Sequence, residues 1–144
     1  MIRTALDTSV VVAALLSWQA SHARALTAVS ASSGPGRRLV LPLPALVQSF
    51  SVMTRLPAAL RLPPRGALDL LHGTFAGLAD LPASPSGDGW RLLEDAVNAG
   101  VVGGAIHDFE ILDLAARAGA TRLLTLDPDD FLRFGDRGVE IVVP

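Results

Sequence analysis

Three aspartates occupy positions where a carboxylate could take part in chemistry. Asp7 and Asp127 each follow directly after a short apolar segment that is typical of a buried β-strand. Asp108 is aligned, at helical offsets of three, four, seven and eight, with the apolar residues Ile111, Leu112, Ala115 and Ala116. The Asp108 carboxylate is therefore expected to point inward, where it needs an arginine, backbone donors or a metal ion.

Together these acids favour a divalent-metal site. If the strands before Asp7 and Asp127 are parallel neighbours, both side chains lie at the carboxyl edge of the sheet, where open α/β sheets bind ligands. We expect the carboxyl groups of Asp7, Asp108 and Asp127 to lie within reach of a hydrated Mg²⁺ or Mn²⁺ ion, or of a close metal pair, because all-oxygen sites suit these ions. Such a site favours cleavage of a phosphate ester. A simpler interpretation is that Asp7 caps a helix and Asp127 begins a turn.

Two absent residue types narrow the possible classes of enzyme. The chain has no cysteine, which excludes disulfides, zinc-thiolate sites, iron-sulfur clusters and thiol nucleophiles. All 12 basic residues are arginine, which excludes the lysine of a P-loop, Schiff-base chemistry and lysine-dependent phosphotransfer sites. The net charge of -2 gives no overall basic footprint, so any contact with a nucleic acid would be local or provided by metal ions.

The length and composition predict a single domain that spans residues 1–144. Hydrophobic residues make up 50% of the chain and charged residues 18%, a balance that supports a buried core and argues against disorder. No apolar run approaches the roughly 18 residues of a membrane-spanning helix, so we expect no membrane association. The N-terminus runs straight into an apolar strand and lacks the features of a signal peptide, so we expect a cytoplasmic protein.

The pattern of apolar segments predicts the elements that position the acids. Strands are expected at residues 2–6, 39–43, 122–126 and 139–143, with a further short one at 78–81. Helices are expected at residues 10–16, 22–30, 44–55, 65–76, 90–98 and 105–118. Strands that alternate with helices predict an α/β domain with a mainly parallel central sheet and helices on both faces.

Three ordered motifs resemble those of the PIN-domain ribonucleases, and in particular the VapC-type toxins of type II toxin-antitoxin pairs. The opening motif is Leu6-Asp7-Thr8-Ser9, the central one runs from Gly103 to Asp108, and the closing one combines residues 124–127 with Asp130-Phe131. The likeness covers nearly the whole chain. It implies a PIN-like domain of three layers.

The resemblance also implies an activity and partners. The activity would be endonucleolytic cleavage of RNA, often tRNA or ribosomal RNA, with Mg²⁺ (or Mn²⁺) held by the catalytic residues Asp7, Asp108 and Asp127. The expected partner is a cognate VapB-type antitoxin. The high apolar fraction and the predicted helices at residues 22–30, 48–55 and 65–76 agree with an antitoxin helix in a groove and with a homodimer.

Gln48 departs from the family pattern. It lies in a stretch, residues 46–55, that resembles the second family motif, at the position where a glutamate is expected. The amide oxygen can still accept a hydrogen bond or contact a metal ion, but it carries no charge and cannot act as a general base. Gln48 is therefore a weakened fourth catalytic position. The alternative is a PIN pseudoenzyme that binds antitoxin or RNA without cutting it.

Four further side chains are auxiliary candidates. Thr125, Thr8 and Ser9 could orient water or phosphate, or could serve only as caps and turns. Asp130 could supply an additional acid, or it could begin a helix that packs through Phe131.

Two other pairs of residues allow either a purely structural interpretation or a competing functional one. Asp127 and Asp129 form an Asp-x-Asp pair, which leaves a Mg²⁺-dependent phosphotransfer enzyme of primase type as a second alternative, although Asp129 is expected to be simply exposed. Asp113 and Arg117 are expected to form an ordinary exposed ion pair on one helix.

Overall fold

A fully parallel sheet forms the centre of the computed structural model, which describes residues 1–144. Its strands are β1 (Ile2–Leu6), β2 (Arg37–Val40), β3 (Ala79–Asp80), β4 (Arg122–Leu124) and β5 (Glu140–Val142). They lie in the order β3-β2-β1-β4-β5, and each neighbouring pair is parallel. The predicted parallel α/β sheet is therefore confirmed.

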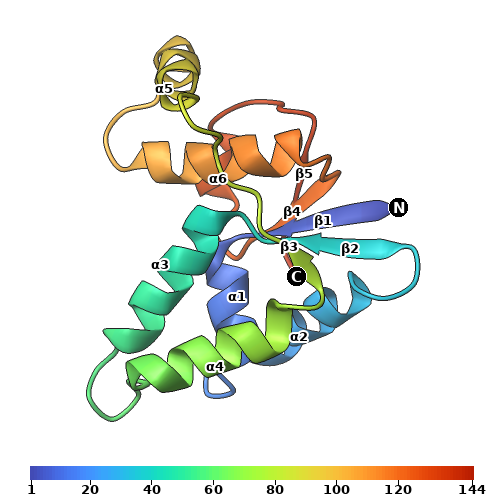
Figure 1. Ribbon diagram of the computed structural model, residues 1–144, viewed down its shortest axis with the longest axis vertical. Coiled ribbons are helices and arrows are strands. Elements are labelled where there is room, and N and C mark those ends of the chain that lie inside the picture. Colours follow the sequence, from blue (N-terminus) through green and yellow to red (C-terminus); the bar gives the residue numbers. More distant parts are fainter.

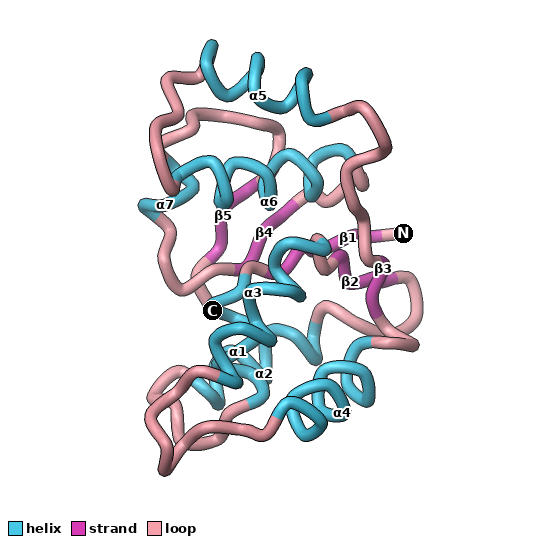
Figure 2. The backbone as a smooth tube through the Cα atoms, turned by 60° about the vertical axis from the view of Figure 1, so that its left-hand side comes forward, coloured by secondary structure: helices cyan, strands magenta, loops and turns pink.

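Seven helices cover the sheet in two layers. They are α1 (Thr8–Leu15), α2 (His22–Ala31), α3 (Leu43–Thr54), α4 (Pro64–Phe75), α5 (Gly89–Asn98), α6 (Ala105–Arg117) and α7 (Asp129–Leu132). Helices α5 and α6 lie on one face of the sheet, and α1, α2 and α4 lie on the other (Figure 1 and Figure 2). Helix α3 packs against α1, α4 and α6, so it connects the two layers. None of the helices combines the length and the hydropathy that a bilayer-spanning segment requires.

The order of the strands changes direction at β1. From β1 the chain adds β2 and then β3 on one side, and it then crosses to the other side, where β4 pairs directly with β1. Open α/β sheets bind ligands outside the carboxyl ends of the strands at such a switch point. Leu6 and Leu124 are paired at these ends, so the residues that follow both strands are brought to the same edge.

The ends of two predicted strands are wrong. The expected strand at residues 122–126 ends at Leu124 in β4, so Asp127 follows the strand by three residues instead of directly. The expected strand at residues 39–43 is replaced by β2, which ends at Val40, and α3 already begins at Leu43. Pro42 occupies the N-cap of α3 and Pro44 lies in its first turn. Proline has no amide hydrogen for a strand ladder and suits the start of a helix, which explains the early exit from the sheet. Of the two interpretations of Asp130, the helix start is confirmed by α7, in which Phe131 is buried.

Helix α1 has an uninterrupted apolar segment after its first turn and is enclosed by its neighbours. Its residues Val10 to Ala14 are at most 4% exposed, and the helix packs against α2 and α3. They belong to a core of 31 buried residues that draws side chains from both helical layers. This packing fixes the start of α1, where Asp7 is the N-cap residue.

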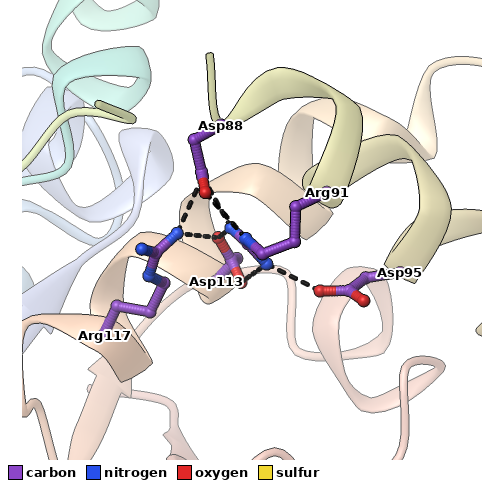
Figure 3. A network of polar contacts seen from close by, with 5 residues as sticks. All are labelled: Asp88, Arg91, Asp95, Asp113 and Arg117. Carbon is purple, nitrogen blue, oxygen red and sulfur yellow. Dashed lines mark hydrogen bonds and ion pairs between the residues drawn. The ribbon is translucent and has the colours of Figure 1, made fainter. Parts of the chain in front are cut away.

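A network of five charged side chains joins α5 to α6 (Figure 3). Arg91 donates hydrogen bonds to Asp88, Asp95 and Asp113, and Arg117 donates to Asp88 at 2.7 Å. Hydrogen bonds, first from Arg91 and then from Arg117, lower the pKa of Asp88 to about 2. The predicted ion pair between Asp113 and Arg117 is present at 4.0 Å, but the Asp113 side chain is only 15% exposed, so the prediction that this pair is exposed is wrong. Asp113 mainly binds Arg91, which a different helix supplies.

Candidate active site

Asp7 lies at the junction of β1 and α1. Its backbone amide donates to the carbonyl of Leu124 at 3.0 Å, and its side chain caps α1. Oxygen Oδ1 accepts a hydrogen bond from the amide of Thr8 at 2.7 Å, and Oδ2 accepts from the hydroxyls of Ser9 and Thr125, both at 2.8 Å. The residue is 5% exposed. Asp7 is therefore a helix cap, as the simpler interpretation held, and also a buried carboxylate at the ligand-binding edge of the sheet.

The Asp7 carboxylate has hydrogen-bond donors but no cationic partner. None of the ion pairs in the structure includes it. Burial raises the pKa of Asp7, hydrogen bonds from Thr125, Ser9 and Thr8 partly offset the rise, and the carboxylate of Asp127 adds to it. A buried anion without a counter-charge is costly, so a cation at this edge would stabilise the site.

The hydroxyls of Thr125 and Ser9 link the end of β4 to the beginning of α1. Thr125 is fully buried, and its Oγ1 donates to Asp7 and accepts from the backbone amide of Asp127 at 3.0 Å. Ser9 Oγ likewise donates to Asp7 and accepts from the amide of Leu126 at 2.9 Å. Both hydroxyls thus position protein groups, and they hold the exposed Asp127 beside Asp7.

Gln48 reaches the same edge from α3. Its Oε1 accepts a hydrogen bond from the hydroxyl of Thr8 at 3.1 Å, and the backbone amide of Thr8 donates to Asp7. A single residue therefore connects the second motif to the first. Because the Gln48 side chain is neutral, it contributes an oxygen to this edge but no negative charge.

Asp108 lies in the first turn of α6. Its side chain is 26% exposed, so it is less buried than the apolar pattern predicts. Burial, followed by the carboxylates of Asp7 and Asp130, raises the pKa of Asp108 to about 6, and Arg133 offsets part of the rise. Arg133 Nη2 donates to Asp108 Oδ2 at 3.3 Å. Of the three kinds of partner that the sequence allows for this carboxylate, the structure contains the arginine.

Four carboxylates thus share the site with one arginine. Electrostatic repulsion couples Asp7 to Asp127, and couples Asp108 to both Asp7 and Asp130. No three acidic or histidine side chains lie close enough to bind an ion directly, so the predicted ligand set of Asp7, Asp108 and Asp127 is not pre-assembled. The donors are nevertheless hard oxygens with excess negative charge. That chemistry fits Mg²⁺ or Mn²⁺ bound in part through water, as Mg²⁺ commonly is.

Arg133 is the site residue that sequence analysis missed. It stands at the C-cap of α7, and 25 positions separate it from Asp108. No periodic pattern links residues so far apart. The available signal was chemical, since Asp108 needs a cationic partner and an arginine follows the closing motif by two residues. Asp129 stays exposed, as the simpler interpretation expected.

The parallel five-stranded sheet and its acidic edge define a PIN-domain fold. VapC20 from Mycobacterium tuberculosis, described as a sarcin-ricin loop cleaving toxin, matches with a TM-score of 0.70 and 16% identity over 95% of this chain and 98% of that chain. VapBC2 from Rickettsia felis, bound to a promoter DNA fragment, matches with a TM-score of 0.66 and 14% identity over 99% of both chains. DNA-bound VapBC from Salmonella typhimurium matches with a TM-score of 0.65 and 18% identity over 99% of this chain and 98% of that chain. At these identities the likeness establishes the fold alone.

A curated relative establishes the family. Ribonuclease VapC40 from Mycobacterium tuberculosis is 33% identical over 126 residues, which cover 84% of this chain and 84% of that protein. No protein-family model matches the chain. The chain belongs to the VapC family of PIN-domain ribonucleases, the toxins of toxin-antitoxin pairs. The family that the motifs indicated is therefore confirmed, and the primase-type alternative is set aside.

Proposed function

We propose that this protein is the toxin of a toxin-antitoxin pair and cleaves RNA endonucleolytically with the help of Mg²⁺ or Mn²⁺. The observation that carries the proposal is the excess of carboxylates at the switch point, where the buried Asp7 has no cationic partner. Clusters of acids with raised pKa values in such a position are typical of functional sites. The expected substrates are cellular RNAs, with tRNA or ribosomal RNA as the targets.

Asp7, Asp108 and Asp127 would hold the ion, directly or through water. When bound, the ion would orient the phosphate, lower the pKa of the attacking water and neutralise the leaving oxygen. Thr125 keeps the Asp7 carboxylate and the Asp127 backbone in a fixed relation, because it binds both. Asp130 adds negative charge beside Asp108.

Gln48 weakens this chemistry without removing it. Its oxygen, held by the Thr8 hydroxyl, can accept a hydrogen bond from water. It adds no charge to attract the ion, and it cannot take a proton as a general base. We therefore expect weak metal binding and slow cleavage that depend on the three aspartates.

The groove between α3 and α4 is where we place the antitoxin. The groove has a volume of about 420 Å³, and nine of its ten lining residues are hydrophobic. Val47 and Phe50 of α3 line one side, and Leu68 of α4 lines the other. An antitoxin segment with apolar residues at helical spacing fits such a groove. Because Gln48 follows Val47 on α3, a bound segment would lie beside the site and could restrain it.

A homodimer is expected to form through α5. Trp90 and Val97 are 81% and 74% exposed, and Leu93 between them is 47% exposed. Their spacing of three and four residues places them on one face of the helix, and exposed apolar faces of this kind mark protein interfaces. Light scattering should therefore find a dimer for the parent and a monomer for Val97→Asp.

Cleavage of total RNA by the purified toxin, freed from its antitoxin, tests the proposed function. We expect fragments with the parent protein and Mg²⁺, and none with Asp108→Asn or in the presence of EDTA. The Asp108→Asn protein must retain its fold and its antitoxin binding for the comparison to hold. A parent protein that folds and binds Mg²⁺ but cuts no RNA would instead be a binding-only member of the family.

A further inference from the structure

Arg133 differs from the other paired arginines because its partner is a carboxylate of the candidate site. The two groups are 3.3 Å apart, from Nη2 of Arg133 to Oδ2 of Asp108. The remaining ion pairs involve carboxylates elsewhere in the fold, at Asp69, Asp80, Asp88, Asp95 and Asp113. Arg133 is thus the one arginine whose ion pair brings positive charge to the four acids of the site.

The guanidinium of Arg133 is held by contacts within its own segment. Its Nε donates to the carbonyl of Asp130 at 2.9 Å, and the group lies 5.1 Å from the centre of the Phe134 ring. The side chain nevertheless remains 45% exposed. Arg133 can therefore face Asp108 and an incoming molecule from nearly the same position.

The contact between Arg133 and Asp108 is one that a better anion could replace. The donor and acceptor are 3.3 Å apart, longer than the usual distance for a charged pair, and both side chains are partly exposed. Exposed ion pairs of this kind are weak. A cation bound by the carboxylates would also reduce the attraction that Asp108 exerts on the guanidinium.

We propose that Arg133 is a substrate-binding residue that pairs with Asp108 until a metal ion and RNA arrive, and then contacts a phosphate of the RNA. A guanidinium presents two parallel N–H groups that match two phosphate oxygens, which makes arginine well suited to this contact. The inference rests on the proposed function, since it assigns a substrate contact within the same site.

The test compares Arg133→Gln, which removes the charge, with Arg133→Lys, which keeps the charge but lacks the planar fork. Arg137→Gln is the matched control. The Arg137 guanidinium also lies against a ring, 5.2 Å from the centre of Phe109, and its Nε also donates to a backbone carbonyl, that of Phe134. It has no carboxylate partner.

The first measurement is the affinity for Mn²⁺, followed by the electron paramagnetic resonance of the free ion, and it needs no catalytic activity. Arg133→Gln removes a charge that competes with the ion for Asp108. It should bind Mn²⁺ about two- to fivefold more tightly than the parent, the range that corresponds to an exposed ion pair. Arg133→Lys and Arg137→Gln should keep the parent affinity.

The second measurement is the affinity for a fluorescent single-stranded DNA oligonucleotide at saturating Mn²⁺, because its phosphates resemble those of RNA. Arg133→Gln should bind the oligonucleotide about tenfold more weakly, as expected for a lost charge-assisted pair of hydrogen bonds. At saturating Mn²⁺ it should cleave RNA about 10²-fold more slowly, the effect of losing one preorganised donor. Arg133→Lys should recover much of the binding and little of the rate.

In Arg133→Gln the affinity for Mn²⁺ should rise and the affinity for the oligonucleotide should fall. These opposite changes distinguish a substrate-binding residue from a structural ion pair, whose loss would alter only thermal stability. Unchanged affinity of Arg133→Gln for the oligonucleotide overturns the proposal, whatever happens to Mn²⁺ binding. If Arg133→Gln binds Mn²⁺ with the affinity of the parent, Arg133 does not compete with the ion for Asp108, and that part of the proposal is overturned. A parent that binds the oligonucleotide through Arg133 but cuts no RNA refutes the proposed nuclease function and leaves this inference standing.

Discussion

Replacement of Gln48 by glutamate should increase metal-dependent cleavage of RNA, because it adds a charge to the second motif. The amide oxygen lies 3.1 Å from the hydroxyl of Thr8, whose backbone amide binds Asp7. For a separation of about 6 Å, as through one water molecule, and an effective dielectric constant of about 40 to 80, a carboxylate there would attract a divalent ion by about 1.4 to 2.8 kcal/mol. This free energy corresponds to an increase of about 10- to 100-fold in the affinity for the metal ion. The rate of cleavage at subsaturating Mg²⁺ should increase by the same factor.

The assay measures initial rates of RNA cleavage over a series of Mg²⁺ concentrations for the parent, Gln48→Glu and Asp108→Asn, each free of antitoxin. Gln19→Glu is the matched control, because it makes the same change of charge in the loop that follows α1, beyond the end opposite Asp7. EDTA controls exclude contaminating metal-independent nucleases. Any advantage of Gln48→Glu that persists at saturating Mg²⁺ measures what the carboxylate does beyond holding the ion.

Two results would refute this reasoning. If the parent cleaves as fast as Gln48→Glu, another acid such as Asp130 already supplies the charge, and the assignment of Gln48 to a weakened position is wrong. If both proteins fold and bind Mg²⁺ but cut no RNA, the nuclease function itself fails and the binding-only alternative replaces it.

Three further substitutions test positioning and charge. Thr125→Val leaves the Asp127 amide unpaired and Asp7 short of a donor, so the free energy of unfolding in urea should fall by about 1 to 3 kcal/mol. Hydrogen bonds from arginine lower the pKa of Asp88 from its ordinary value of 3.8 to about 2, so the stabilisation that these bonds provide is present above pH 3.8 and is lost toward pH 2. Asp88→Asn should remove this pH dependence of the urea midpoint. Burial and neighbouring acids raise the pKa of Asp108 from 3.8 to about 6. Without a metal ion, the free energy of unfolding of the parent should therefore fall as the pH rises across that range, and it should fall less in Asp108→Asn.

Matched controls accompany these substitutions. Thr121→Val changes an exposed threonine at the start of the same strand region, and Asp129→Asn removes an exposed acid beside the site; both should leave stability near that of the parent. Equal loss of stability in Thr125→Val and Thr121→Val would contradict the role of the buried hydroxyl. Identical pH profiles for the parent, Asp88→Asn and Asp108→Asn would contradict the electrostatic assignments.

The sequence predicts the sheet and the edge of the site well because both depend on local patterns. The apolar segments before Asp7 and Asp127 identify two neighbouring strands, and their parallel pairing brings the residues that follow them to one edge of the sheet. The partners of Asp108 and Asp113 could not be predicted in this way. Each binds an arginine more than 20 residues away, on another helix or at its end, and only tertiary packing determines those contacts.

The local roles of the site acids do not explain why they are charged. Asp7 caps α1 and Asp108 lies in the first turn of α6, where a negative charge is favourable, yet burial and mutual repulsion raise the pKa of both. An asparagine or serine would cap α1 without a buried charge. The charges therefore point to a need outside folding, which a cation would satisfy. Arg133 and Gln48 both make the net charge of the site less negative, since Arg133 adds a positive charge and Gln48 omits a negative one. Together they reduce the repulsion among the acids when no ion is bound. They also weaken the binding of that ion.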